Sequence, residues 1–347
     1  MSNILLVFTG GTIGSLASAG TIRPSGSARQ LLLELLYARQ PGYRTVNFDI
    51  IEPLQLLSEN MSPAAWTVLV EAVLEARAEQ YDGVIICHGT DTLAYTAAML
   101  GFCLARCKPP VLLVASDYPL TDPNANGLSN FISAIEYILQ IGSSGVFVPY
   151  RNLHGMCEVH LGGRLTCSLQ LGSDFYSVQG KSLLKFINKQ FVAPYPGIAE
   201  IAIPHGIGSE ADSCLVAARF CPRLLMIRPY PGLNYLHYDL SQVDVVLHDL
   251  YHSGTACVTG QWGEDLSLLA FLRRCHAAGI KVYLAPALYG SDAYESTRAL
   301  VAEGAEMIWN TSIEAAYIKL LLAYGNFSED GQRAHFIHSD WVGERVE

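Results

Sequence analysis

The sequence has little charge and no surplus of basic residues. Only 16% of its 347 residues are charged, the formal net charge is −10 and the pI is about 5.5. Binding to nucleic acid or to an anionic membrane surface needs clustered Lys and Arg, so the sequence argues against both partners. It contains no stretch of about 18 apolar residues that could span a membrane. The first apolar run, ILLVF, is short and has no basic segment before it, so no signal peptide is predicted.

The motifs of metal, disulfide and nucleotide sites are also missing. The nine cysteines show neither CxxC nor His-rich spacing, which argues against a zinc site or a disulfide framework. A reducing, cytoplasmic setting is the simplest one for such a chain. Neither the GxGxxG spacing nor a P-loop occurs, so no nucleotide site is predicted. We therefore expect no cofactor and no metal, and a small polar molecule as the substrate.

Two stretches of similar design are present, ILLVFTGGTIG at 4–14 and DGVIICHGTDT at 82–92. In each, an apolar run typical of a buried parallel strand ends in a glycine-rich turn that carries hydroxyl side chains. Open α/β sheets bind ligands at the carboxyl ends of their strands. We therefore expect Thr9, Thr12, Thr90 and Asp91 to surround one crevice.

The rest of the chain predicts an α/β fold with two domains. Residues 1–187 read as a larger domain with a mostly parallel, doubly wound sheet, closed by a β-hairpin at 158–171 around Gly162 and Gly163. Residues 15–27 read as a flexible loop over the crevice, and Ser62 as the N-cap of a helix that begins at Pro63. A linker at 188–212, with one short strand at 199–203, leads to a smaller α/β domain at 213–347. Its last stretch, 328–347, is polar without a clear period.

The TGGTIG and HGTDT motifs, in this order and on these strand ends, resemble the bacterial-type L-asparaginases, especially the cytoplasmic type I branch. The resemblance extends from about residue 4 to residue 324. It implies hydrolysis of a side-chain amide through a threonine acyl-enzyme, with L-asparagine as the default substrate. It also implies a cytoplasmic homodimer or homotetramer.

Matched motif by motif, the resemblance gives candidate roles to six residues. Thr12 would be the nucleophile, Thr90 the second hydroxyl, Asp91 the group that holds the substrate ammonium, and Ser58 the group that binds its carboxylate. Gly11 and Gly89 would leave space for the substrate beside the backbone N–H groups of Thr12 and Thr90, which could form an oxyanion hole. Asp91 could instead be, or also be, the N-cap of the helix that follows it.

The sequence departs from the family at the position of an activating lysine. It has no lysine between Lys108 and Lys181. Aligning RLTC with the family pattern puts Cys167 at this position, with His160 and Ser168 as alternatives. Because a cysteine thiol is mostly neutral at pH 7 whereas lysine is charged, the site would lose a cation.

Three further positions differ from the family pattern. Thr21 stands where the family has a loop tyrosine that helps to activate the nucleophile. Glu59 replaces a polar neutral residue beside Ser58, and Thr255 replaces an asparagine of the second domain. These changes leave two hypotheses open: an amidohydrolase acting on asparagine or on a longer or more cationic amide, or a silent or repurposed relative. The latter would be a ligand binder or an acyl transferase on a specialised amide.

Overall fold

The computed structural model describes residues 2–18, 20–194, 216–290 and 292–347, which form two compact units. The first contains the residues up to Ala218 together with Trp341–Glu344. The second is Arg219–Asp340 with residues 345–347. Most of the predicted linker, including the strand expected at 199–203, lies outside the described residues. The predicted α/β architecture, with a larger mostly parallel sheet and a smaller second one, is confirmed.

The first unit is built on an eight-stranded sheet with the order β10-β9-β8-β7-β6-β5-β1-β4. The five strands from β4 to β7 in this order run parallel, and β8, β9 and β10 are added antiparallel. The strands of the sheet are β1 Asn3–Phe8, β4 Asn47–Ile51, β5 Gly83–Cys87, β6 Val111–Val114, β7 Val146–Arg151, β8 Cys157–Leu161, β9 Leu184–Ile187 and β10 Gln190–Val192.

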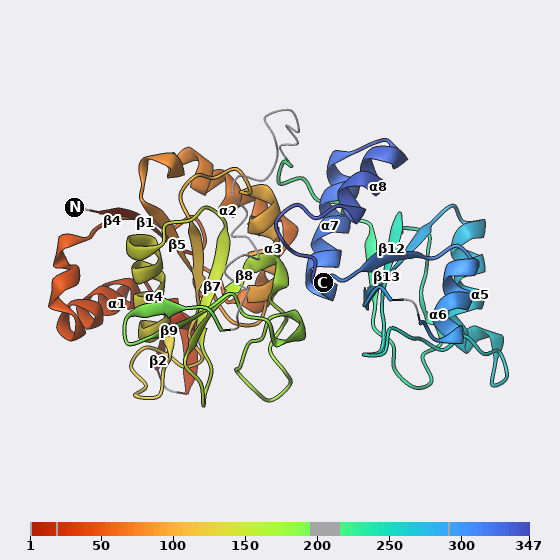
Figure 1. Ribbon diagram of the computed structural model, residues 1–347, viewed down its shortest axis with the longest axis horizontal. Helices are drawn as coiled ribbons and strands as arrows, with labels where there is room; N and C mark the ends of the chain where they lie inside the picture. Colours follow the sequence, from red (N-terminus) through yellow and green to blue (C-terminus); the bar gives the residue numbers. More distant parts are fainter. Residues whose placement is uncertain (1, 19, 195–215, 291) are drawn as a thin grey trace. The chain divides into compact units, whose positions relative to one another are not determined.

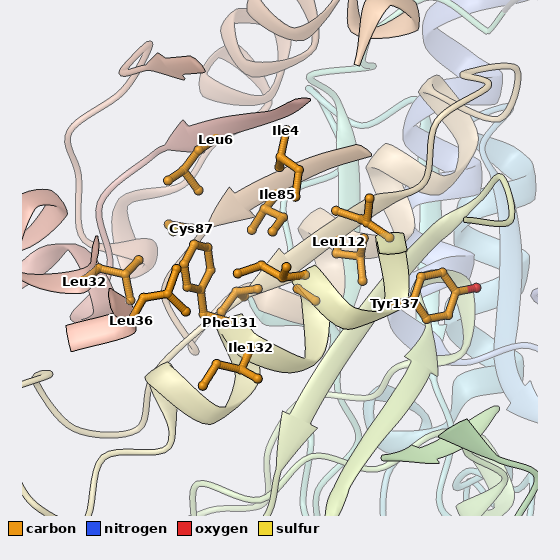
Figure 2. Close-up of a cluster of buried hydrophobic side chains, with 14 of the residues drawn as sticks. Ile4, Leu6, Leu32, Leu36, Ile85, Cys87, Leu112, Phe131, Ile132 and Tyr137 are labelled. Atoms are coloured by element: carbon orange, nitrogen blue, oxygen red, sulfur yellow. The ribbon is translucent and has the colours of Figure 1, made fainter. Parts of the chain in front are cut away.

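Helices cover both faces of this sheet (Figure 1). They are α1 Gly26–Arg39, α2 Pro63–Glu75, α3 Leu93–Cys103 and α4 Gly127–Gln140. Figure 2 shows one core, in which Leu32 and Leu36 of α1 and Phe131 of α4 pack on Ile4 and Ile85 of the strands. The opposite face receives α3, which is apolar all round: nine of its eleven residues are buried.

The start of α2 agrees with the prediction made from its capping signal. The helix begins at Pro63, and the Ser62 side chain accepts a hydrogen bond from the Ala65 N–H at 3.4 Å. Proline suits the first helical position because its missing N–H would have no partner there. This cap fixes the end of the segment that carries Ser58.

The prediction of a flexible loop at 15–27 was wrong. Strands β2 Ser15–Ser18 and β3 Thr21–Pro24 pair antiparallel, with Ser18 opposite Thr21. Gly20, at φ 75°, takes the left-handed conformation that so short a reversal requires. The hairpin is fixed to the turn after β1, because the Ser25 N–H donates to the Gly14 carbonyl at 2.9 Å.

The hairpin predicted at 158–171 was also wrong. Strand β8 ends at Leu161, and Gly162 and Gly163 begin a one-turn 3₁₀ helix. A Cβ on Gly162 would lie 2.7 Å from the Ala97 carbonyl oxygen of α3, so this glycine permits a close approach of two backbones. The antiparallel pairs of this sheet are instead β7 with β8, β8 with β9 and β9 with β10.

The tight hairpin of β9 and β10 crosses the predicted domain boundary at 187. Its two loop residues, Asn188 and Lys189, both have positive φ, at 50° and 63°. Two such residues form the mirror-image turn that matches the twist of paired strands. The first sheet therefore continues into the segment predicted as linker.

The second unit is a four-stranded parallel sheet with the order β11-β12-β13-β14 and helices on both faces (Figure 1). Its last helix, α8, lies in the tail for which no period was visible, and buries Phe336 and Ile337. The elements are β11 Leu224–Ile227, β12 Val245–Asp249, α5 Leu268–Ala277, β13 Lys281–Ala287, α6 Glu295–Ala302, β14 Glu306–Trp309, α7 Ile313–Asn326 and α8 Asp330–His338.

Four residues near the C-terminus, Trp341–Glu344, belong to the first unit. The buried carboxylate of Glu344 accepts hydrogen bonds from the N–H groups of Trp341 and Val342, at 3.0 and 2.9 Å. The Arg164 side chain donates to the Gly343 carbonyl. Within the described ranges, no helix is both long and apolar enough to cross a membrane.

Candidate active site

The turn after β1 depends on two glycines held at positive φ. Gly10 lies at φ 110°, and a Cβ there would be 2.1 Å from the Leu56 carbonyl oxygen. Gly11, at φ 69°, donates its N–H to the same carbonyl at 3.0 Å. These contacts place the one-turn 3₁₀ helix Thr12–Gly14 at the carboxyl end of β1, with Thr12 partly exposed.

The turn after β5 lies directly against the turn after β1. A Cβ on Gly11 would be 2.3 Å from the Gly89 nitrogen and 2.4 Å from its Cα, so the two backbones touch. Thr12 and Thr90 each follow one of these glycines, and both are partly exposed. The contact therefore brings the two predicted hydroxyl residues onto adjoining loops.

Ser58 connects this region to Asp91. Its hydroxyl donates to Asp91 Oδ2 and accepts from the Asp91 N–H, both at 3.2 Å. A Cβ on Gly89 would lie 2.4 Å from Ser58 Oγ, so Ser58 also touches the second turn. Ser58 is buried, whereas Asp91 is exposed. The pair thus presents a carboxylate beside a hydroxyl at the edge of the glycine turns.

Asp91 does not cap the helix that follows it. The N-cap of α3 is Thr92, whose hydroxyl donates to the Ser58 carbonyl at 2.9 Å. Asp91 lies one residue earlier, where a side chain is outside the helix. The carboxylate is therefore available for a role other than capping.

Thr9 differs from the other hydroxyl residues of the two motifs. Its side chain is buried and donates to the Cys87 carbonyl at 2.9 Å, which ties β1 to β5. Ser15, which the sequence did not single out, donates to the Gly11 carbonyl at 2.6 Å and so holds the first turn. The sequence signal that could have predicted this hydrogen bond is the position of Ser15, four residues after Gly11.

Three further predicted residues are partly or fully exposed. Glu59 is the middle residue of the one-turn helix Ser58–Asn60, next in sequence to Ser58. Thr21 begins β3, whose far end is held against Gly14 through Ser25. Thr255 belongs to the second unit, where its hydroxyl lies 2.9 Å from that of Ser253.

The three candidates for the missing lysine lie in different environments. Burial lowers the pKa of His160 to about 4, and its Nδ1 lies 2.9 Å from the Ser177 hydroxyl. His160 is therefore neutral at pH 7 and cannot supply the lost cation. Ser168 donates to the Gly172 carbonyl at 3.0 Å. Cys167 lies between them in the sequence and is half-buried. It comes two residues after Leu165, which forms an isolated antiparallel β-bridge with Ser177.

His88, at the end of β5, has a structural environment. Burial lowers its pKa to about 4, against the smaller opposing effects of Gly89 and Asp91. Its Nδ1 lies 2.8 Å from the Gly89 carbonyl oxygen, which suits a neutral ring that donates there. In the part of the chain that the structure describes, no cluster of His, Cys, Asp and Glu has the arrangement of a metal site.

Residues 3–166 match the family model of the asparaginase N-terminal domain. The L-asparaginase of Thermococcus kodakarensis is 28% identical over 333 residues, covering 93% of both chains. The chain therefore carries an asparaginase-family domain over residues 3–166.

Two further proteins align over almost the whole chain. One of the subunits of the glutamyl-tRNA(Gln) amidotransferase of Metallosphaera sedula is 26% identical, covering 98% of this chain and 76% of that protein. The crystal structure of L-asparaginase I from Vibrio cholerae superimposes with a TM-score of 0.78 at 23% identity, covering 100% of this chain and 99% of that one. The last likeness concerns the fold alone.

Proposed function

We propose that this protein hydrolyses the side-chain amide of L-asparagine or of a related small amino-acid amide. It belongs to a family of amidohydrolases. The observation that carries the proposal is the contact between Gly11 and Gly89, which puts Thr12 and Thr90 on adjoining loops. Ser58 and Asp91, next to them, offer the hydrogen-bonding groups that an amino-acid head group needs.

In the proposed reaction, the Thr12 hydroxyl attacks the amide carbon. An ester forms between Thr12 and the acyl group, the C–N bond breaks, and the nitrogen leaves as ammonia with the hydroxyl proton. Water then hydrolyses the ester, which restores Thr12 and releases the carboxylic acid. The N–H groups of Thr12 and Thr90 would stabilise the oxyanion that develops in both steps.

Substrate binding would change the partner of the Ser58 hydroxyl. In the structure this hydroxyl donates to Asp91. If the substrate ammonium binds Asp91 and its carboxylate binds Ser58, the hydroxyl turns from the aspartate to the substrate. The exposed carboxylate of Glu59 adds negative charge beside this position, which favours longer or more cationic amides over free asparagine.

Activation of the nucleophile is where the chain differs most from its family. A threonine hydroxyl reacts slowly unless a base or a positive field assists it. On the motif alignment, Cys167 and Thr21 would stand where the family has lysine and tyrosine, and His160 is neutral and hydrogen-bonded. We therefore expect slow turnover of free asparagine.

The test is ammonia release from purified protein supplied with L-asparagine, L-glutamine and a panel of longer, neutral and cationic amides. Release should disappear in Thr12→Ala and persist in Thr45→Ala, which removes an exposed threonine of the same unit. Ser58→Ala should raise KM more than it lowers kcat, because Ser58 binds the head group. Equal release by Thr12→Ala and the unchanged protein would refute the threonine mechanism.

The second candidate function is a repurposed site that binds an amide or transfers its acyl group. The missing cation favours it, as does the similarity to a component of an amidotransferase. Hydroxylamine would capture a transferable acyl group as a hydroxamate. Binding of amides, detected by a thermal shift, without ammonia or hydroxamate would indicate the silent binder.

The assembly and the location are further proposals. We infer a homodimer or homotetramer in the cytoplasm, on the resemblance and on the scattered cysteines. Light scattering after size-exclusion chromatography measures the assembly, and a monomer at micromolar concentration would contradict it.

A further inference from the structure

The second unit contains a pocket of about 170 Å³ at the carboxyl ends of two neighbouring parallel strands. One wall is formed by residues 229–233, which follow β11. The other is formed by Tyr251, Cys257 and Thr259, which follow β12, and by Trp262, which precedes α5. In α/β sheets this edge is the common place for ligands.

Tyr235, one of the lining residues, is held in place by a stacked ring and a hydrogen bond. Tyr235 is buried and stacks on Phe271, with ring centroids 4.7 Å apart and planes 24° apart. Its hydroxyl lies 2.8 Å from Nε2 of the buried His248. Burial lowers the pKa of His248 to about 4, so this nitrogen is an acceptor at pH 7 for the tyrosine hydroxyl. The ring of Tyr235 therefore faces the pocket with its polar atom already bonded elsewhere.

The rim, in contrast, leaves large aromatic side chains in water. Trp262 is 78% exposed and Tyr230 52% exposed. Exposed aromatic groups around a concave apolar site are typical of surfaces that a ligand covers.

The lining carries no charge. It consists of tyrosine, tryptophan, proline, leucine and glycine, with one threonine and one cysteine. Thr259 Oγ1 accepts from the Gln261 N–H at 3.1 Å, and the Cys257 thiol points to the Thr259 carbonyl at 3.9 Å. The ion pair of Arg228 with Asp249, 3.6 Å apart, comes from the ends of the same two strands but does not line the pocket. A charged ligand would therefore lose its water without gaining a counterion.

We propose that this pocket binds a small uncharged aromatic molecule of one ring or two fused rings. A volume of about 170 Å³ is slightly larger than the roughly 150 Å³ cavity that accepts benzene. The ring would lie on Tyr235 and be covered at the rim by Tyr230 and Trp262, with offset stacking or edge contacts to each. The site is built from other residues than the candidate active site, and it stands whether or not the proposed amidohydrolase activity is found.

The experiment is titration of the full-length protein with indole and with p-cresol, followed by saturation-transfer NMR and calorimetry. Benzoate and benzyltrimethylammonium serve as charged probes of similar size. We expect indole to bind with a Kd below about 1 mM, and both charged probes to bind at least about fivefold more weakly.

Two variants locate the binding. Trp262→Ala removes a rim group that is too exposed to support the fold, and Cys257→Phe fills the pocket. Each should weaken indole binding at least about fivefold. The control is Tyr289→Ala, which removes an equally exposed aromatic side chain of the same unit after β13.

The proposal is overturned by any of three results in protein that keeps its thermal midpoint. The first is that neither neutral probe binds at concentrations up to about 5 mM. The second is that a charged probe binds as tightly as indole. The third is that Trp262→Ala and Cys257→Phe bind indole as tightly as the control variant does. Tighter binding of benzyltrimethylammonium would identify a site for cations instead.

Discussion

Gly11 and Gly89 determine how closely the two hydroxyl-bearing loops can approach. Gly11 combines a left-handed backbone, at φ 69°, with space for no more than a hydrogen on the side that faces Gly89. Any side chain would meet the backbone of the opposite turn, and a backbone cannot move aside as a flexible side chain can. The loops that carry Thr12 and Thr90 can therefore touch only because Gly11 and Gly89 have a hydrogen atom in place of a side chain.

We expect Gly11→Ala to destabilise the protein by about 2–4 kcal/mol, since backbone strain adds to a steric clash. The same change should remove any amidase activity by separating the loops. Thermal and urea unfolding, together with ammonia release, measure both effects. Gly26→Ala is the matched control, because a Cβ on Gly26, the first residue of α1, would meet no atom within 4 Å. A variant as stable and active as the control would contradict this account.

Cys167 offers a gain-of-function prediction. If it stands at the position of the family lysine, Cys167→Lys returns a cation to the site and should raise kcat on asparagine about tenfold or more. Because the restored cation is the cause of the gain, the added rate should be lost when the new amine deprotonates at high pH. Ser168→Lys places the same charge one residue away and should leave kcat unchanged. Equal rates in both variants would show that the alignment of RLTC is incorrect.

The sequence could predict which residues meet at the glycine turns, because neighbouring parallel strands end at the same edge of a sheet. It could not predict that Thr9 would bond to the Cys87 carbonyl while Thr12 stays partly exposed. That difference depends on the positive φ of Gly10 and Gly11, which changes the direction of the chain between the two threonines. Nor does a one-dimensional pattern show that Ser58 bonds to both the side chain and the backbone of Asp91.

Among the elements, α3 and the 3₁₀ turn after β8 make a close backbone contact that depends on Gly162. A Cβ there would meet the Ala97 carbonyl at 2.7 Å and that of Val146 at 3.1 Å. We expect Gly162→Ala to cost about 1–3 kcal/mol of unfolding free energy. Urea unfolding at pH 7 measures this loss. Gly155→Ala, where the nearest atom would be an ordinary 3.5 Å away, should change stability by less than about 0.5 kcal/mol.

The elements predicted incorrectly share a physical cause. Gly162 and Gly163 were interpreted as the turn of a hairpin, but close tertiary contacts are the reason for glycine at these positions. A local sequence pattern does not distinguish a glycine in a turn from a glycine in a close contact. The turn of Asn188 and Lys189 lacks the glycine that usually marks it. Helix α8 is mostly polar, and it packs on the second unit through the two buried residues Phe336 and Ile337. By contrast, the central strands were predicted well because they are buried on both faces and apolar throughout.

At the scale of the whole molecule, three buried histidines make stability depend on pH. Burial lowers the pKa values of His88, His160 and His248 to about 4. In the unfolded chain these pKa values return to about 6.5, so the unfolded state binds more protons between pH 6.5 and pH 4. The stabilisation is complete above about pH 6.5 and decreases as the pH falls toward 4, by up to roughly 3 kcal/mol for each histidine.

Urea unfolding at several pH values between 7 and 4 would show this slope. His160→Gln should flatten it for the first unit and His248→Gln for the second. His252→Gln, which changes an exposed histidine, should leave it unaltered. A slope that none of the buried-site variants changes would mean that carboxylates alone determine the acid sensitivity.

The return of Trp341–Glu344 to the first unit has a consequence for synthesis in the cell. These residues follow most of the second unit in the chain, yet the Glu344 carboxylate is buried among them and Arg164 bonds to Gly343. Until they have been synthesised and have emerged from the ribosome, the first unit lacks this segment. We expect a nascent chain stalled before Trp341 emerges to be cut by protease in the region of Arg164 and to become resistant only after synthesis continues and the chain is released. Equal resistance before and after release would show that the tail is dispensable for completing the unit.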